Sequence, residues 1–118
     1  MEQVERINPM RWTDTDGVKY TFDFDKKSVL FAEQRGFKVE DFFDYLKSKA
    51  PEFFFYACRM HHGSLSRTQT DALLEKMGGL TMTEWSRLVD LFRQAQYSHV
   101  VISDEDVAKN RVGTVELD

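Results

Sequence analysis

Hydrophobic and polar residues alternate near the N-terminus as they do in a β-strand. Between Val18 and Phe24 every second residue is aromatic or β-branched, and the residues between them are Lys, Thr and Asp. The preceding turn carries Asp16-Gly17, a pair that readily adopts a positive φ. Met10–Trp12 can pair as the other strand. The pattern predicts a β-hairpin whose aromatic face packs against other elements, because a lone two-stranded hairpin is only marginally stable.

Helical periodicity and end signals predict two helices directly after the hairpin. The first covers Lys26–Arg35, with Asp25 as its N-cap and Gly36 just past its C-terminus. The second runs from Val39 to about Lys49. Its apolar positions follow the i, i+3, i+4, i+7 spacing of one helix face, namely Val39, Phe42, Phe43 and Leu46.

A third helix is predicted to begin at Pro51 and to run to Met60, since proline suits the first turn of a helix. It contains Phe53–Cys58, a stretch that is apolar on every side. A helix of this kind lies in the middle of a domain. We therefore expect it to be the most buried element, with Phe54 and Phe55 in the core.

Two further helices are marked by capping boxes at their N-termini. Ser66 with Gln69 opens the fourth helix, which stops at Gly78-Gly79, and Thr81 with Glu84 opens the fifth. The fifth helix has one apolar stripe, formed by Trp85, Leu88, Val89, Phe92 and Ala95.

These elements predict a mainly α fold of the α+β class, with about five helices, an N-terminal β-hairpin and a short C-terminal strand at Val100–Ile102. We expect one globular domain over residues 1–102 and an acidic tail over residues 103–118. The tail holds five acidic residues and two basic ones. Residues 112–117 alternate loosely, which favours their addition as a strand to an exposed edge such as that of the hairpin.

Composition and charge narrow the class of protein. The chain has 118 residues, 42% of them hydrophobic, and a net charge of −4. Its longest apolar run is too short for a membrane span, and its polar N-terminus has no signal-peptide pattern, so we expect a cytosolic protein. Outside the acidic tail the charges nearly balance, which leaves no basic footprint for nucleic acid. The expected partner is another protein.

One cluster of metal-ligand residue types is present. Cys58 precedes His61 and His62 by one helical turn, and the only other histidine is His99. A zinc site needs three or four ligands. The simpler interpretation is that Cys58 is buried and that the histidines are structural, hydrogen-bonding near the turn at Gly63, so we expect no metal and no cofactor.

No residue set supports catalysis. Cys58 lies in an apolar segment, where a thiol is inert, and Ser64 and Ser66 stand in no triad or elbow pattern. Gly78-Gly79 lacks the context of a phosphate-binding loop. We therefore expect that the protein is not an enzyme.

Aromatic residues are numerous, 16 in all, of which ten are Phe. The simplest interpretation is a core built from Phe in place of Leu, since single apolar residues on a surface are normal. Some of the aromatics would otherwise be surface anchors for a partner. The candidates are five aromatic residues, Trp12, Tyr20, Phe22, Trp85 and Tyr97, together with Met10.

The sequence resembles the small tail assembly chaperones of long-tailed phages and prophages of Gram-positive bacteria. The resemblance rests on Tyr20–Asp25, on Ser28-Val29 followed by residues 33–37 (EQRGF), and on Phe54–Ala57 followed by the His pair. Ser66 and the helix ending at Gly78-Gly79-Leu80 also match. The similarity covers residues 20 to about 95, and its motifs are aromatic and glycine placements.

This resemblance implies a largely helical, self-associating protein without enzymatic activity. Its partners would be the tape measure protein, which it keeps soluble during tail tube assembly, and the tail tube protein. It would act in the host cytoplasm and be absent from the mature virion.

Two alternatives use other features of the sequence. The acidic tail would suit a small regulatory protein that inhibits a host nucleic-acid enzyme by mimicking DNA, although the nearly neutral body lacks the required charged face. Cys58, His61 and His62 would suit a metal-dependent enzyme, which elemental analysis would test.

Overall fold

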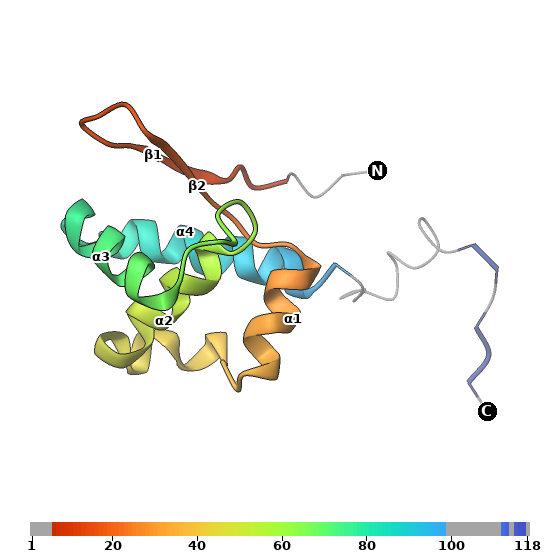
Figure 1. Cartoon of the computed structure of the whole chain (residues 1–118). Coiled ribbons are helices and arrows are strands. Elements are labelled where there is room, and N and C mark those ends of the chain that lie inside the picture. Colours follow the sequence, from red (N-terminus) through yellow and green to blue (C-terminus); the bar gives the residue numbers. More distant parts are fainter. Residues whose placement is uncertain (1–5, 99–111, 114, 118) are drawn as a thin grey trace.

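A computed structural model describes residues 6–98, 112–113 and 115–117. Five helices and a two-stranded antiparallel hairpin make up the described part, which confirms the mainly helical α+β fold (Figure 1). The strand expected at Val100–Ile102 lies outside the described residues.

The hairpin pairs β1 (Met10–Thr13) with β2 (Lys19–Phe22), so that Trp12 lies opposite Tyr20 and Met10 opposite Phe22. In the turn, the Asp14 amide donates to the Val18 carbonyl at 2.9 Å and the Gly17 amide to the Asp14 carbonyl at 3.0 Å. Gly17 has a φ of 82°, as the glycine of a G1 bulge requires. The turn sequence therefore sets the register of the two strands.

Helix ends lie where the local signals predict them for three of the helices. These three helices are α1 (Lys26–Gln34), α3 (Arg67–Met77) and α4 (Met82–Gln96), and each begins with a complete capping box. Gly78 ends α3 in the left-handed conformation, with a φ of 80°.

The segment between α1 and α3 differs from the prediction. Val39–Asp44 forms a 3₁₀-helix, η1, and the α-helix that was expected to begin at Pro51 begins earlier, as α2 (Leu46–Cys58). The two are separated by Tyr45, whose φ of −134° and ψ of 50° are not helical. Pro51 therefore lies inside a helix and does not open one.

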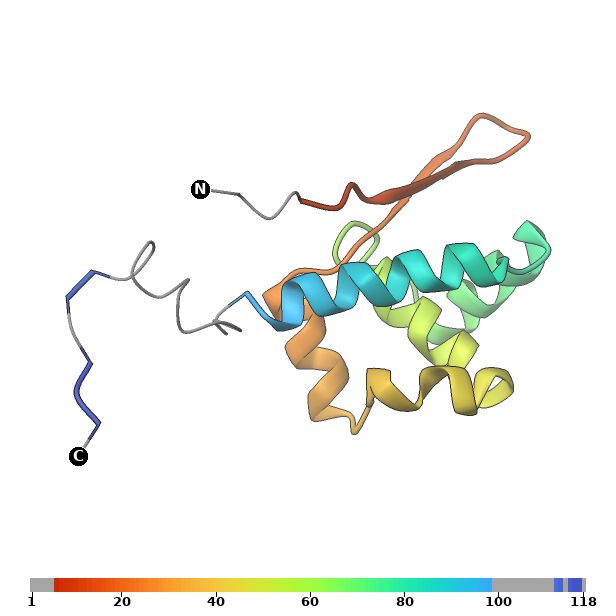
Figure 2. The same ribbon diagram turned by 180° about the vertical axis from the view of Figure 1, so that it is seen from behind.

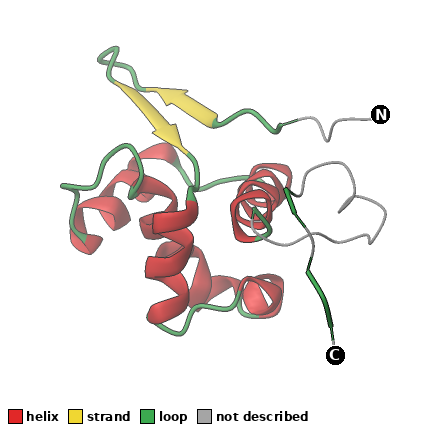
Figure 3. Ribbon diagram, turned by 90° about the vertical axis from the view of Figure 1, so that its right-hand side faces the viewer, coloured by secondary structure: helices red, strands yellow, loops and turns green. Residues whose placement is uncertain are grey.

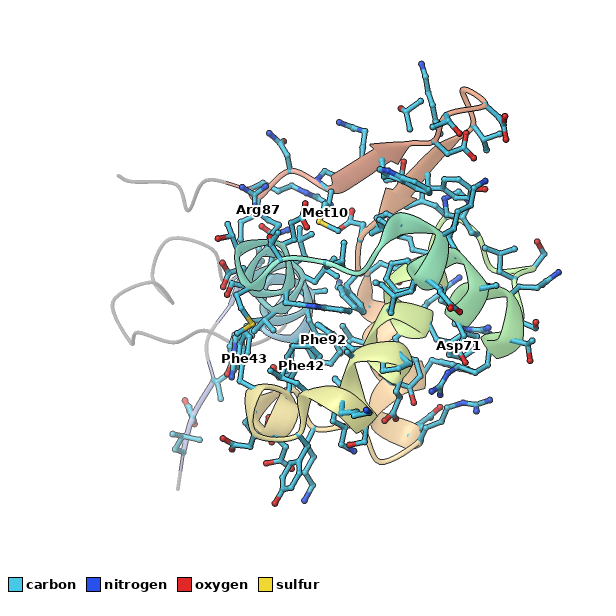
Figure 4. The ribbon with its side chains drawn as sticks, turned by 90° about the vertical axis from the view of Figure 1, so that its left-hand side faces the viewer. Met10, Phe42, Phe43, Asp71, Arg87 and Phe92 are labelled. Atoms are coloured by element: carbon cyan, nitrogen blue, oxygen red, sulfur yellow. The ribbon has the colours of Figure 1, made fainter. Side chains whose placement is uncertain are left out.

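The three-residue repeat of η1 changes which side chains are buried. Val39 and Phe42, three residues apart, point to the core, whereas Phe43 is 41% exposed. Figure 4 shows Phe42 and Phe92 among the packed helices, with Phe43 beside them. The expectation that Phe43 belongs to the buried stripe is wrong, because that spacing assumes an α-helix.

Helix α2 is the central element, in contact with α1, α3, η1 and β2. Phe53 and Phe54 are fully buried, and Phe55 is half-buried, which confirms the expected central place of this helix. The ring of Phe53 lies 4.9–6.4 Å from five other aromatic rings, those of Phe24, Phe37, Phe42, Trp85 and Phe92. Helix α4 runs along one side of this core (Figure 2).

The hairpin lies to one side of the helices, and Figure 3 shows no helix on the far side of its strands. Its base is tied to α2 by the Asp23 amide, which donates to the Ala57 carbonyl at 3.2 Å. Its tip is tied to α3 by Lys76 Nζ, which lies 3.1 Å from Asp14 Oδ2. Met10 points from the hairpin toward the helices, near Arg87 of α4 (Figure 4).

Candidate protein-binding surface

Two of the five aromatic residues expected to bind a partner are core residues. Phe22 is 0% exposed, with its ring 5.0 Å from that of Phe54, and Trp85 is 6% exposed and packs on Phe42. Their expected surface location is therefore wrong. Phe22 lies at the hairpin base and Trp85 on the inner stripe of α4, and both places are closed by α2 and η1.

Trp12 and Tyr20 form an aromatic stack on the hairpin. Their ring centroids lie 5.5 Å apart at an interplanar angle of 24°, and both side chains are half-buried. The Tyr20 ring also lies 5.4 Å from the ring of His62. Met10, Trp12 and Tyr20 are partly buried and pack from the hairpin against the core.

His62 is a structural acceptor for the hairpin. Its Nε2 accepts a hydrogen bond of 3.0 Å from the backbone amide of Thr21, so the ring is neutral and carries its proton on Nδ1. Burial lowers the pKa of His62, and the neighbouring His61 lowers it further. This confirms the expectation of a backbone hydrogen bond for one histidine, although the partner lies on β2 and not at the turn near Gly63.

Cys58 and His61 are not joined to His62 as a metal site. Cys58 is 1% exposed, and burial raises the pKa of its thiol to about 12, so the thiol stays protonated. His61 is exposed, with its ring centroid 6.5 Å from that of His62. In the parts of the chain that the structure describes, no group of three metal-binding side chains is found.

Tyr97 lies at the C-terminal end of α4 and is 40% exposed. Its hydroxyl accepts a hydrogen bond of 3.2 Å from the Arg93 guanidinium, one helical turn earlier. The described residues show no contact that joins Tyr97 to the hairpin aromatics. The candidate residues therefore do not form one site: Trp12 and Tyr20 lie together and Tyr97 lies apart.

A second surface, between α1 and the end of α2, was missed by the sequence analysis. At its centre is Phe31, whose ring is half-buried. The guanidinium carbons of Arg35 and Arg59 lie over this ring, 4.3 Å and 3.8 Å from its centroid. Neither guanidinium forms an ion pair with another described residue. Leu30, 54% exposed, and Met60, 38% exposed, line a pocket of about 550 Å³ together with Phe31 and Arg59. We call Leu30, Phe31, Arg35, Arg59 and Met60 the Phe31 surface.

One sequence signal points to the Phe31 surface. Helix α1 buries Ser28, Val29 and Ala32, which lie on one face. Leu30 and Phe31 are two large apolar residues off that face, more than a helix of nine residues needs to pack on one side. Arg, Phe and Met are also enriched where proteins bind one another.

The comparisons with known proteins give one match. A family model described as "Domain of unknown function (DUF5055)" matches residues 4–117, so the chain belongs to this family. Neither the curated proteins nor the solved structures give a match. Among the described helices, none combines the length and the apolar character that crossing a membrane requires.

Proposed function

We propose that this DUF5055 family member is a phage tail assembly chaperone that binds the tape measure protein and keeps it soluble while the tail tube assembles around it. The identity of the partner comes from the sequence resemblance. The structural observation that carries the proposal is the Phe31 surface, where exposed apolar side chains lie beside two guanidinium groups that form no ion pair with the described residues.

The chemistry of the Phe31 surface suits a helical segment that carries both apolar and acidic residues. Leu30, Phe31 and Met60 would cover apolar side chains of the partner, and Arg35 and Arg59 would pair with its carboxylates. A guanidinium held on an aromatic ring loses little freedom when it pairs, because the ring already restricts it. Such a surface can bind many similar helical repeats, as a long partner would require.

The scaffold beneath this surface is well packed. Arg59 and Met60 directly follow α2, whose side chains fill the core. The ring centroid of Phe31 lies 6.2 Å from that of Phe55 and 5.9 Å from that of Tyr56. A surface that is ordered before binding loses less entropy on binding. Trp12, Tyr20 and Tyr97 remain proposed contacts outside it, and the tail tube protein remains a proposed second partner. In this proposal the protein acts in the host cytoplasm and is left out of the finished virion.

The proposal is tested by co-expressing the chain with the tape measure protein encoded in the same genome, a very long and helical product. The readouts are the soluble fraction of the tape measure protein and its recovery with the tagged chain. We expect the unmodified chain to raise both, and Leu30→Asp to lower both by about tenfold, which corresponds to the loss of one well-buried contact.

Met82→Asp is the matched control, because Met82 is 55% exposed, about the same as Leu30, but lies at the start of α4 outside the Phe31 surface. It should leave both readouts unchanged. If the unmodified chain neither binds nor solubilises the tape measure protein, the proposed function is wrong. If Leu30→Asp and Met82→Asp behave alike, the function stands but the Phe31 surface does not carry it.

A further inference from the structure

Among the described residues, strand β1 pairs with β2 along one edge and with no strand along the other. The Asp14–Val18 hydrogen bond sets the alternation of the hairpin, so Trp12 and Met10 exchange hydrogen bonds with β2, whereas the backbone groups of Arg11 and Thr13 point away from it. Thr21, opposite Arg11, obeys the same alternation, since its amide points outward to His62. The outer edge of β2 is thus covered at Thr21 by His62, and just past the strand the Asp23 amide donates to the Ala57 carbonyl of α2. Among the described residues, nothing pairs with the backbone of Arg11 or Thr13 at the outer edge of β1.

The two faces of this edge differ in chemistry. On the side toward the helices, β1 presents Met10 and Trp12, which pack on the core. On the outer side the hairpin presents Arg11, Thr13, Lys19 and Thr21, a row with two positive charges and no negative one. A strand added to this edge would therefore need apolar residues on one face and acidic residues on the other.

The segment after residue 111 has this pattern. Val115 and Leu117, two residues apart, fall on one face of an extended chain, and Glu116 and Asp118 fall on the other. In the structure Val115 is 58% exposed and Leu117 is 94% exposed, so neither side chain is buried. As a third strand, the segment would place its apolar residues on the face of Met10 and Trp12. Its acidic residues would lie on the opposite face, which carries Arg11 and Lys19.

We infer that the C-terminal segment of one copy, residues 112–118, adds as a third strand to the β1 edge of a second copy, so that the protein self-associates through exchanged tails. Val115 and Leu117 extend the apolar row of Met10 and Trp12, and Glu116 lies on the same face as Arg11. The backbone of Arg11 and Thr13 supplies the hydrogen bonds. This contact is separate from the Phe31 surface and does not depend on the proposed function.

The first test measures the association of full chains by sedimentation equilibrium and uses two matched pairs of variants. Arg11→Pro removes an outward amide that β2 does not use, and Arg11→Ala keeps that amide. Val115→Asp with Leu117→Asp removes the apolar face of the tail, and Val112→Asp changes a residue that is 100% exposed and falls on its other face. All four leave the buried core unchanged, which helical circular dichroism verifies.

We expect the unmodified chain to associate, and both Arg11→Pro and the Val115/Leu117 double variant to weaken the association about tenfold or more. Arg11→Ala should weaken it by about fivefold or less, because an exposed ion pair contributes little. Val112→Asp should have a similarly small effect. A chain that stays monomeric at the highest attainable concentration overturns the inference, as does equal behaviour within each pair.

The second test asks whether the tail binds another copy or its own chain. Arg11→Pro has an intact tail and a defective edge, whereas the double tail variant has an intact edge and a defective tail. Mixing the two should restore association, because the intact tail of the first variant can bind the intact edge of the second. The resulting heterodimers are detected by native mass spectrometry of chains with different isotope labels. Absence of these heterodimers overturns the inference, since a tail folded on its own chain gives no complementation. If Arg11→Pro fails to fold, Thr13→Pro takes its place, because it removes the other outward amide of β1.

Discussion

Replacing Phe53 by Ala should be the most damaging single truncation along α2. Phe53 is 0% exposed and contacts five aromatic rings, the nearest of which, that of Phe42, lies at 4.9 Å. Phe→Ala changes in a core cost about 3–5 kcal/mol through lost transfer free energy and the cavity that remains. Aromatic pairs add about 0.5–1.5 kcal/mol each beyond buried area, so the upper end, about 4–5 kcal/mol, is expected here. That is a large part of the stability of a domain of this size.

The two following residues provide controls of identical chemistry in the same helix. Phe54 is also 0% exposed but has one aromatic neighbour, Phe22, so Phe54→Ala should cost about 3–4 kcal/mol. Phe55 is partly buried, and Phe55→Ala should cost about 2 kcal/mol, because part of its side chain stays in contact with water in the folded chain. Phe53→Leu retains most of the volume and should cost about 1.5 kcal/mol or less.

Urea unfolding followed by circular dichroism at 222 nm measures the four free energies of unfolding. The expected order of cost is Phe53→Ala, then Phe54→Ala, then Phe55→Ala. If Phe53→Ala leaves too little folded protein, Phe53→Leu still gives a measurable shift of the midpoint. A cost for Phe55→Ala as large as that for Phe53→Ala would refute the placement of Phe53 at the centre of the aromatic core.

Two further predictions concern how the hairpin is held. Burial and the nearby His61 lower the pKa of His62, so the unfolded chain binds the extra proton first as pH falls below 6.5. The stability that His62 contributes through its hydrogen bond from Thr21 is therefore present above that pH and is lost as the pH falls below it. Urea unfolding at pH 7.5 and 5.5 should show this loss of stability, and the loss should be smaller in His62→Gln, which cannot titrate. Asp14 is the second case: although burial raises its pKa, hydrogen bonds from the turn and from Lys76 outweigh this and keep the carboxylate charged. Asp14→Ala should speed amide hydrogen exchange in the hairpin but not in α4, and equal acceleration of both would contradict a local role.

The helix ends were predictable because the groups that fix them are neighbours in the sequence. Ser66 with Gln69 and Thr81 with Glu84 form the capping boxes that their spacing indicates, and Gly78 takes the positive φ that a helix stop needs. The hairpin was predictable for the same reason, since its register is set within the turn at Asp14–Val18. These interactions span three or four residues, and no distant contact is needed to make them.

The error between residues 39 and 51 has a tertiary cause. The spacing of Val39, Phe42 and Phe43 fits one face of an α-helix, but Phe42 packs 5.2 Å from Trp85, which is more than forty residues away. The short 3₁₀ turn that carries Phe42 there leaves Phe43 outside. A local preference for α-helix is weaker than the burial of a large aromatic ring.

The sequence by itself determined the hairpin, most of the helix ends and the central place of the Phe-rich helix, because each follows from short-range hydrogen bonding or from an uninterrupted apolar run. Only the tertiary structure decided which aromatics are surface residues. Phe22 and Trp85 became core while Leu30 and Phe31 remained accessible, and His62 was joined to Thr21 across forty-one positions. The physical reason is that exposure depends on which elements cover a side chain, and that is settled by packing between segments that are distant in the sequence.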